Sequence, residues 1–529
     1  MIETKIENDL VLPQWLPFQK AAKLREATAL LKGLGRQSDE VGRSNSAAFL
    51  EELRKFHSDP NPFVGAELMG VSVSIGREAE TRLLAEYVRN QPDLGPVPIH
   101  EAERILGRSS RPEAETNVRI ASLKRHLSEH PSDAVAWIEQ ARYYTILGQL
   151  ERARKSVMAA LHLAPTDRFV VRAAIRFFVH NKEWDTALRC AFRAYSHLED
   201  PLILGPLLSV GTHLNMLPNK MKPIAETAFL SEDVFLYSET LEAIGTLEAR
   251  RSALARAKRF FKRAWMDPTR AVIGHSQWVL RQHLPGLADD QKIDFDQSHE
   301  AMSWLKFSAF DISGAMARAE DWALEEPYSR APYILGSSAA CVEERYMDAI
   351  GIARRGLMSN PKDDVLLNNL AYAELRNGKV ADGEIIFAPL RGSLGLKDNI
   401  AALGTYGLLL MMKGDIEGGA EQYRTAAKRA SELGNRDLVL YANLNFAISM
   451  LDVAKKLDVE LLRSSQVRLA TTLDPGSVGA AMALQRRIVR SDLTGSDELS
   501  VAAREFAERA VMAKERLLGR YGRAVSSLR

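Results

Sequence analysis

Two pairs of prolines in this sequence stand 34 residues apart, Pro131 with Pro165 and Pro327 with Pro361. A fixed period of this length is typical of chains built from stacked helical pairs, in which each pair buries its apolar face against its neighbours. Apolar residues recur at intervals of three and four and seldom alternate, which favours helices over strands. The sequence therefore predicts an all-α array, a solution that suits a chain of 529 residues better than one compact core.

The segment from Ala134 to Asp167 shows what one unit contains. Its landmarks are Trp137, Ala141, Tyr144, Gly148, Ala153, Ala160 and Pro165. Small residues let two antiparallel helices cross closely, and aromatic residues fill the spaces between them. A glycine ends the first helix, and a proline follows the second. With these landmarks the segment resembles the tetratricopeptide-repeat (TPR) family, and the resemblance implies an α-solenoid of helical hairpins.

The resemblance to the TPR family covers roughly residues 115 to 455. Residues that keep the frame beyond the first unit include Ala187, Ala194, Ala257, Phe261, Ala264, Ala315, Tyr333, Ala349, Gly378, Gly414, Tyr423 and Ala426. The opening Leu366-Leu-Asn-Asn-Leu-Ala-Tyr-Ala resembles many bacterial TPR helices. Residues 1–114 are predicted to form a helical N-terminal region, either degenerate repeats or a separate domain, with helices over 17–32, 46–57 and 77–91. Residues 456–529 are predicted to form a helical C-terminal cap.

The overall charge of the chain excludes a global electrostatic function. Lys and Arg number 70 against 68 Asp and Glu, so no net field recruits nucleic acid or a membrane surface. Two cysteines, Cys190 and Cys341, suggest no disulfide framework, and the charged N-terminus lacks the apolar region of a signal peptide. No apolar run is judged long enough to span a membrane. We therefore expect a cytoplasmic protein with no membrane partner.

The TPR resemblance implies that the first helix of each repeat lines a groove that holds a partner. Carried over by position, the groove residues are Arg142, Asn368, Asn369, Tyr372, Arg376 and Asn443. Asn443 is included because Leu440-Tyr-Ala-Asn aligns with Leu366-Leu-Asn-Asn, while the intervening repeat has Thr405. A row of amides can grip a peptide backbone through both donors and acceptors. The alternative is that each asparagine bridges neighbouring helices of the array.

The strongest local charge lies between Arg250 and Arg263, a stretch with seven basic residues and no acidic one. On a single helix its basic face would comprise Arg251, Arg256, Lys258, Arg259, Lys262 and Arg263. The opposite face would comprise Ala253, Ala257, Phe260, Phe261 and Ala264. Such a face suits phosphates or an acidic partner, but it also suits an ordinary solvated helix surface.

No set of residues predicts catalysis, a metal site or a cofactor. His126 and His130 have the spacing of two metal ligands, but no glutamate follows His126 in the pattern of a zinc protease and no third ligand is evident. No nucleophile with a base can be identified. We expect a non-catalytic scaffold or adaptor that binds a partner protein, as a subunit of a larger complex. The alternative is a regulator that contacts nucleic acid through the basic face.

Overall fold

The computed structural model describes residues 10–15, 53–54, 56–58, 60–74, 78–91, 94, 96–106, 112–216, 221–282, 293, 295, 298–393, 399–491 and 497–526. All regular secondary structure in these ranges is helical, which confirms the predicted all-α class. The described residues fall into two compact units, one that ends before Pro285 and one that begins there. Each unit is described by itself. The predicted boundaries at residues 114 and 455 stay predictions.

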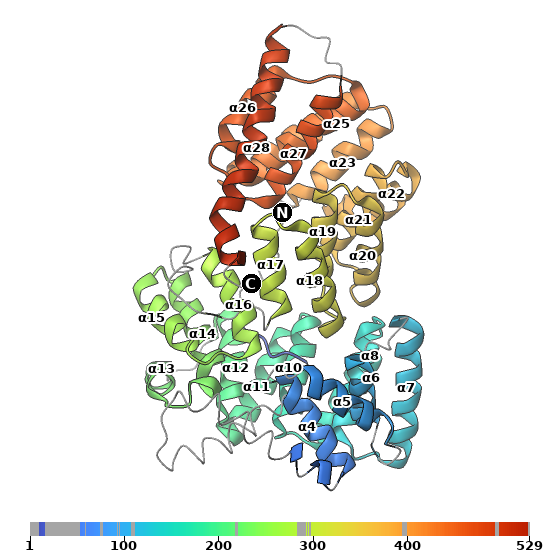
Figure 1. The fold of residues 1–529 in the computed structure, drawn as a ribbon, viewed down its shortest axis with the longest axis vertical. Helices are drawn as coiled ribbons and strands as arrows, with labels where there is room; N and C mark the ends of the chain where they lie inside the picture. Colours follow the sequence, from blue (N-terminus) through green and yellow to red (C-terminus); the bar gives the residue numbers. More distant parts are fainter. Residues whose placement is uncertain are drawn as a thin grey trace. The chain divides into compact units, whose positions relative to one another are not determined.

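The N-terminal unit consists of helices joined by short turns (Figure 1). They are α4 (Pro62–Ser74), α5 (Glu78–Arg89), α6 (Pro96–Ile105), α7 (Pro112–Glu129), α8 (Ala134–Ile146), α9 (Leu150–Leu163), α10 (Arg168–His180), α11 (Trp184–Leu198), α12 (Pro201–His213), α13 (Met221–Leu230), α14 (Val234–Arg250), α15 (Leu254–Ala264) and α16 (Arg270–Gln282). Helix α5 confirms the helix predicted over 77–91. The helix predicted over 17–32 lies outside the described residues, and the one over 46–57 is described only at its end.

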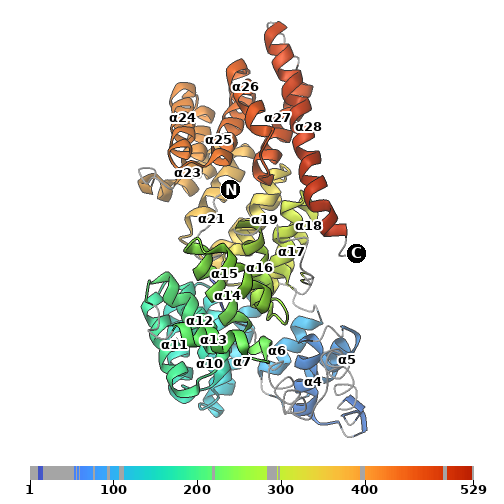
Figure 2. The same ribbon diagram turned by 90° about the vertical axis from the view of Figure 1, so that its left-hand side faces the viewer.

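The C-terminal unit continues the same pattern of paired helices (Figures 1 and 2). They are α17 (His299–Ser308), α18 (Ile312–Glu325), α19 (Ala331–Val342), α20 (Tyr346–Ser359), α21 (Asp364–Arg376), α22 (Val380–Phe387), α23 (Ile400–Met412), α24 (Ile416–Glu432), α25 (Arg436–Ser449), α26 (Val459–Leu469), α27 (Pro475–Arg490) and α28 (Asp497–Ser526). A short 3₁₀ segment, Ala388–Ser393, follows α22, and a π segment, Met450–Ala454, follows α25.

Aspartates at the N-cap fix where the first helix of several hairpins begins. The side chains of Asp133, Asp167 and Asp363 accept hydrogen bonds of 2.9–3.0 Å from backbone N–H groups in the first turn. These bonds satisfy donors that an α-helix leaves unpaired at its start. Arg330 donates to Asp363 at 2.7 Å from one repeat earlier, so the cap also joins neighbouring hairpins.

A residue with a left-handed backbone ends the first helix of each clear hairpin. Glycine supplies this conformation at Gly148, Gly378 and Gly414, where φ is 66°, 83° and 96°. At the equivalent turns of other hairpins the residues are Lys182, Asn215, Ser252, Phe310 and Glu344, with φ between 56° and 61°. The next N–H then bonds five residues back, as from Arg345 to the Ala340 carbonyl at 2.9 Å. The turn geometry therefore persists where the glycine landmark is lost.

Small residues stand where the paired helices cross. Ala141, Ala153 and Ala160 are completely buried, as the repeat pattern predicts. At the crossing of α23 and α24, a Cβ on Gly407 would come within 2.9 Å of the Gly419 carbonyl oxygen. Side chains larger than hydrogen would separate these two helices, so close packing fixes the residue type at each crossing.

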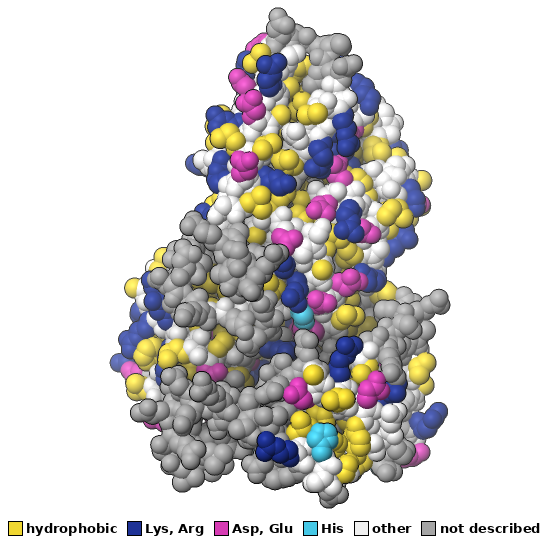
Figure 3. All heavy atoms as spheres, in the orientation of Figure 1, with side chains coloured by type: hydrophobic (Ala, Val, Ile, Leu, Met, Phe, Trp, Pro, Cys, Tyr) yellow, Lys and Arg dark blue, Asp and Glu magenta, His cyan; other side chains and the backbone are white. Residues whose placement is uncertain are grey.

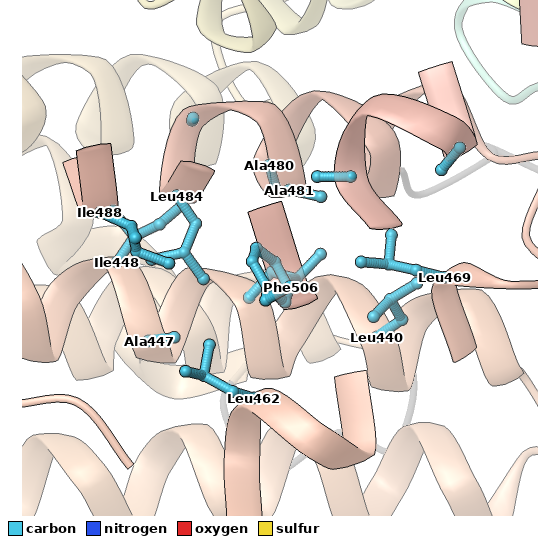
Figure 4. Close-up of a cluster of buried hydrophobic side chains, with 14 of the residues drawn as sticks. Leu440, Ala447, Ile448, Leu462, Leu469, Ala480, Ala481, Leu484, Ile488 and Phe506 are labelled. Carbon is cyan, nitrogen blue, oxygen red and sulfur yellow. The ribbon is translucent and has the colours of Figure 1, made fainter. Parts of the chain in front are cut away.

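The last three helices share one core with α25 (Figure 4). Leu440, Leu462, Leu484 and Phe506 come from α25, α26, α27 and α28 respectively, and all four are fully buried. Helix α28 runs alongside α26 and α27 (Figure 2). The C-terminal region is helical, as predicted, and its helices extend the stack by packing onto the array through a large apolar core.

Helix α27 also reaches α19, which lies far earlier in the sequence. A Cβ on Gly479 would come within 2.4 Å of the Cγ1 atom of Val342, so the two helices touch at this glycine. Beside the contact, Arg486 donates to Glu344 at 2.6 Å, and Arg487 also pairs with Glu344. Helix α27 therefore closes a ring with α19, α21, α23 and α25. The repeat pattern alone does not predict this closure.

One stretch among the described residues, Arg436–Ala454, is long and apolar enough to cross a membrane by length and composition. From the sequence, no apolar run of that length was expected. Half of the apolar window is buried in the protein, where Leu440, Leu444 and Ile448 belong to the core shared with α26, α27 and α28. Packing among helices accounts for its apolar character.

Candidate functional site

The main candidate site is a pocket between the first helices of successive hairpins in the C-terminal unit. It is a cavity of about 100 Å³ that opens to solvent. The lining residues come mainly from α19, α21, α23 and α25, with Gly476 at the start of α27. None of the lining residues is Asp, Glu, Lys or Arg. Such an apolar cavity with a few polar groups is the usual form of a binding site.

Two predicted groove residues, Asn368 and Asn369, line this pocket on α21. Asn369 donates to the hydroxyls of Ser337 and Ser338 at 3.0 and 3.1 Å, so its amide joins α21 to α19. Asn368 is buried, with 9% of its surface exposed, and its Oδ1 atom has no hydrogen-bond partner among the described residues. Of the two neighbouring asparagines, Asn369 joins α21 to α19, whereas the Oδ1 atom of Asn368 is enclosed by protein.

Tyr372, also predicted, lines the pocket one turn further along α21. Its hydroxyl donates to Oδ1 of Asn445 at 3.0 Å, and the Asn445 amide donates to the Tyr441 carbonyl at 2.9 Å. Asn445 lines the pocket but was not selected from the sequence. Asn443 was selected, but it is not among the lining residues.

The register of α25 explains the difference between Asn443 and Asn445. The pocket is lined by Val365, Asn368, Asn369 and Tyr372 from α21, and the same spacing recurs in Leu438, Tyr441, Ala442 and Asn445 from α25. The two helices are thus related by 73 residues, whereas the sequence alignment used 74. Asn445 corresponds to Tyr372, and Ala442 corresponds to Asn369. The sequence alignment matched Leu440 to Leu366 by residue similarity, and this match is one residue out of register with the structure.

Arg376, the next predicted residue, is held inside the protein. It donates to the Tyr372 hydroxyl at 3.2 Å, to Ser449 at 3.0 Å and to Asp452 at 3.0 Å. Asp452 also accepts a hydrogen bond of 2.8 Å from Arg487 of α27. Arg376 therefore joins α21 to the helices that close the ring, and each of its three guanidinium nitrogens donates a hydrogen bond within the protein.

Arg142 belongs to the N-terminal unit and does not line the pocket. It is buried on α8, with its guanidinium 3.6 Å from the Glu139 carboxylate. Burial raises the pKa of Glu139 above its ordinary value, and the nearby charge of Arg142 offsets only part of this rise. The pair belongs to a buried polar layer that also contains Tyr143 and Arg119, which are joined by a hydrogen bond of 3.0 Å.

The predicted basic face is not one helix. Arg250 is the last residue of α14, Ser252 has a φ of 60°, and α15 begins at Leu254. The single-helix expectation was wrong because a hairpin turn occurs here without glycine. Arg251 therefore lies in the turn and not on the α15 face. Of the residues predicted to pack on the opposite face of this helix, Ala257 and Phe261 are fully buried.

Lys and Arg side chains gather on the visible face over α15 (Figure 3). Several basic side chains of this region make contacts within the unit. Arg256 pairs with Glu248 at 2.9 Å, and Arg251 lies 3.9 Å from the same carboxylate. Arg259 stacks on the Phe229 ring at 4.1 Å, and Arg263 donates to the Ser231 carbonyl at 2.7 Å. Lys258 and Lys262, also on α15, make no ion pair with any residue that the structure describes. Fewer basic side chains are therefore available to bind a ligand on this face than the sequence suggests.

The described residues do not assemble a metal site or an activated thiol. No group of three or more potential ligands occurs among them. His126 instead pairs with Asp133 at 2.8 Å. Cys341 lines the pocket, but burial raises the pKa of its thiol to about 12, so it is protonated near neutral pH. Burial likewise raises the pKa of Cys190 to about 11.

No protein-family model matches the sequence, and no curated protein sequence matches it. Solved structures that it resembles include yeast Tom70, with 14% identity over 76% of this chain and 93% of that chain, at a TM-score of 0.29. The match to the Cut9–Hcn1 heterotetramer of the APC/C has 12% identity and covers 89% of this chain and 94% of that chain, with a TM-score of 0.36. The match to the human IFIT1 dimer with PPP-AAAA has 14% identity and covers 77% of this chain and 93% of that chain, with a TM-score of 0.30. Identities and TM-scores this low do not support assigning the function of these proteins to this chain. The TPR-like fold is inferred from the helical hairpins of this chain alone.

Proposed function

We propose that this chain is a non-catalytic, cytoplasmic interaction scaffold of the TPR type, and that a segment of a partner protein binds in the pocket of the C-terminal unit. The observation that carries the proposal is the pocket itself, in which four successive first helices present apolar side chains and amides around one neutral cavity. Repeat arrays bind partners through such surfaces because neighbouring hairpins align equivalent positions. The partner is proposed to bind within a larger complex.

The pocket can be filled from inside to test this function. A Cβ on Gly404 would meet only the Tyr423 ring, at 3.6 Å, so Gly404→Leu places a side chain in the cavity without a backbone clash. The matched control is Gly351→Leu on the exposed side of α20, where a Cβ would meet nothing within 4 Å. Both changes replace a helical glycine by leucine.

The readout is quantitative affinity purification of the tagged chain from its native cells. We expect at least one protein to be retained by the wild type and by Gly351→Leu and to be lost with Gly404→Leu. If Gly404→Leu is folded by circular dichroism and still retains every partner, the pocket is not the partner site.

The alternative function, nucleic-acid binding through α15, has weaker support because four of its six predicted residues already contact groups within the unit. The decisive variant is Lys258→Glu with Lys262→Glu, since these two side chains remain without ion pairs among the described residues. Filter binding of single-stranded RNA at low salt distinguishes the two functions. We expect no retention that depends on these lysines, and salt-sensitive retention lost in the double variant would favour the alternative.

A further inference from the structure

One first helix of the N-terminal unit, α10, is buried on every side. All ten residues from Val170 to Val179 are buried, and ten consecutive residues cover every face of an α-helix. Its partner in the hairpin, α11, buries only Ala187, Ala191 and Ala194. In an open array of hairpins, the concave side of the first helices is the surface that receives a ligand. On α10 this side is already covered.

Part of the cover is a short segment from far earlier in the sequence, residues 10–15, which we call the arm. The arm belongs to the N-terminal unit and forms no helix. Trp15 at its end is completely buried, and its ring meets the Phe177 ring of α10 edge to face, with the ring centroids 6.2 Å apart. The arm therefore packs on a first helix, the element on which such arrays hold their ligands.

The arm has the burial pattern of an extended peptide with one face against a surface. Val11, Pro13 and Trp15 are buried, whereas Leu12 and Gln14 between them are partly exposed. Successive side chains of an extended chain point to opposite sides, so the three buried residues share one face. Proline suits this position because it favours an extended backbone and brings no N–H group that would need a partner.

The sequence of the arm defines the chemistry of a ligand. Leu-Val-Leu-Pro-Gln-Trp contains no charged residue. Its buried face consists of an aliphatic residue, a proline and a tryptophan, and the tryptophan supplies the largest apolar surface. A segment of another protein with these residue types at the same spacing could make the same contacts, because an extended peptide is recognised through its alternate side chains.

We propose that the surface around Phe177 is a second binding site of this chain, for an extended and neutral segment of a partner protein. That segment has an aliphatic residue, a proline and a tryptophan at alternate positions. The arm occupies the site in cis, so the partner segment binds only to molecules from which the arm has been displaced. This site lies in the N-terminal unit and is independent of the function proposed for the pocket.

A peptide with the sequence of the arm tests the site on the full-length chain. The peptide is amidated and carries fluorescein at its N-terminus, and fluorescence anisotropy measures its binding. Trp15→Ala removes the contact with Phe177 and should free the site. Because apparent affinity is proportional to the fraction of open sites, we expect Trp15→Ala to bind the peptide about tenfold or more tightly than the wild type. Trp184→Ala, which removes a partly buried tryptophan at the start of α11, should bind it as the wild type does.

A second peptide tests the spacing of the buried face. In Leu-Val-Leu-Pro-Trp-Gln the last two residues are exchanged, so the composition is unchanged but the tryptophan moves to the other side of an extended chain. We expect Trp15→Ala to bind this peptide about tenfold or more weakly than the arm peptide, the usual loss when a buried aromatic anchor is removed. Hydrogen exchange gives an independent readout. Amides of α10 should exchange faster in Trp15→Ala and regain protection when the arm peptide is added.

Each alternative outcome would overturn the proposal. A Trp15→Ala chain that is folded by circular dichroism but does not bind the arm peptide at millimolar concentration has no such site. Equal binding of the two peptides, or equal affinity of the wild type and Trp15→Ala, would also reject it. A wild-type dimer that the peptide dissociates would show that the arm is exchanged between copies and does not act in cis.

The test does not depend on the stability of one variant. Trp15→Leu keeps an apolar side chain and is measured in parallel with Trp15→Ala. If neither variant folds and the arm peptide does not restore their helices, the arm is a permanent part of the core and the site does not exist. None of these measurements involves the pocket of the C-terminal unit, so their failure would leave the proposed function untouched.

Discussion

Lys182, Ser252 and Glu344 have left-handed backbones that side chains with a Cβ disfavour, with φ of 61°, 60° and 61°. The left-handed conformation costs an L-residue roughly 1–2 kcal/mol. These residues tolerate it because their own N–H group and that of the next residue both find carbonyl partners, as where Lys182 donates to Val179 at 2.9 Å and Glu183 donates to Phe178 at 2.8 Å. The chain thus keeps the repeat geometry at a cost in stability at each such turn.

Replacing Lys182 by glycine should stabilise the N-terminal unit. Lys182 is exposed, so little packing is lost, and glycine relieves the strain while adding some unfolded-state entropy. We expect Lys182→Gly to raise the free energy of unfolding by about 0.5–1 kcal/mol. Urea denaturation measures it. Gly148→Ala, the reverse change at the equivalent turn, should lower stability by about 1 kcal/mol or more. A loss of stability in Lys182→Gly would contradict this explanation of the turn.

The N-terminal unit contains a buried ion pair that should tolerate removal of both partners better than of one. Arg172 donates to both oxygens of Glu239 at 2.8 and 2.9 Å, and Thr269 donates to the same carboxylate at 3.1 Å. Both charged side chains are almost completely buried. Glu239→Gln leaves a buried guanidinium without its counter-charge, which costs about 3–5 kcal/mol.

The double variant Arg172→Met with Glu239→Leu is the control for this prediction. It removes both charges and keeps most of the volume, so it should recover a large part of the stability lost by Glu239→Gln. Denaturant titration of the wild type, Glu239→Gln and the double variant measures the free energy of unfolding of each and tests this prediction. A double variant less stable than Glu239→Gln would show that packing, and not the unpaired charge, sets the cost.

At the scale of helices, the sequence predicts the hairpins better than the contacts between distant hairpins. Ala141, Ala153 and Ala160 act within one unit, so their spacing is sufficient to predict the crossing. Asn443 was chosen by matching Leu440-Tyr-Ala-Asn to Leu366-Leu-Asn-Asn, and the pocket lining shows that this alignment is one residue out of register. The basic stretch was assigned to one helix because Ser252 gives no sign of a turn. Both predictions fail at hairpins that keep the backbone geometry of the repeat although the residue typical of that position has been replaced.

The closure of α27 on α19 depends on contacts that no repeat pattern encodes. Burial raises the pKa of Glu344, but the hydrogen bonds and charges of Arg486 and Arg487 outweigh it, so its pKa lies below the ordinary value. A carboxylate with a depressed folded pKa contributes stability above its unfolded pKa, and that contribution is lost as pH falls through the folded pKa.

Acid should therefore weaken the contact between α19 and α27. We expect Glu344→Gln to lower the free energy of unfolding of the C-terminal unit at pH 7 by about 1–3 kcal/mol, since two arginines lose a charged acceptor. The difference between wild type and variant should shrink as the pH is lowered below about 4.5, the ordinary pKa of a glutamate. Urea midpoints at several pH values measure it. A difference that stays constant over this range would show that the Glu344 charge does not hold the two helices together.

At the scale of the whole molecule, the pocket belongs to one of the two compact units. Its lining runs from Phe307 to Gly476, which lies entirely in the C-terminal unit. That unit has its own apolar cores, including the one shared by α25, α26, α27 and α28. Repeat arrays draw their stability from neighbouring hairpins, so a complete unit should not need the other to form its pocket.

A fragment of residues 285–529 should therefore fold and retain the partner that the full-length chain retains. Circular dichroism and affinity purification from native cells provide the two readouts. Shortening the same fragment at residue 496 removes α28, including Phe506, and exposes the core residues Leu440, Leu462 and Leu484 that pack against it. We expect this shorter fragment to lose cooperative unfolding. A folded 285–529 fragment that retains no partner would mean that the partner site depends on the rest of the chain.

Hydrogen exchange of the full-length chain, alone and with the partner captured by the wild type, tests the central claim most directly. The account predicts that protection on binding concentrates in the first helices of the C-terminal unit, above all α21 (Asp364–Arg376) and α23 (Ile400–Met412). Protection confined to the second helices, α20, α22 and α24, or to α15, with no change in α21 and α23, would contradict it.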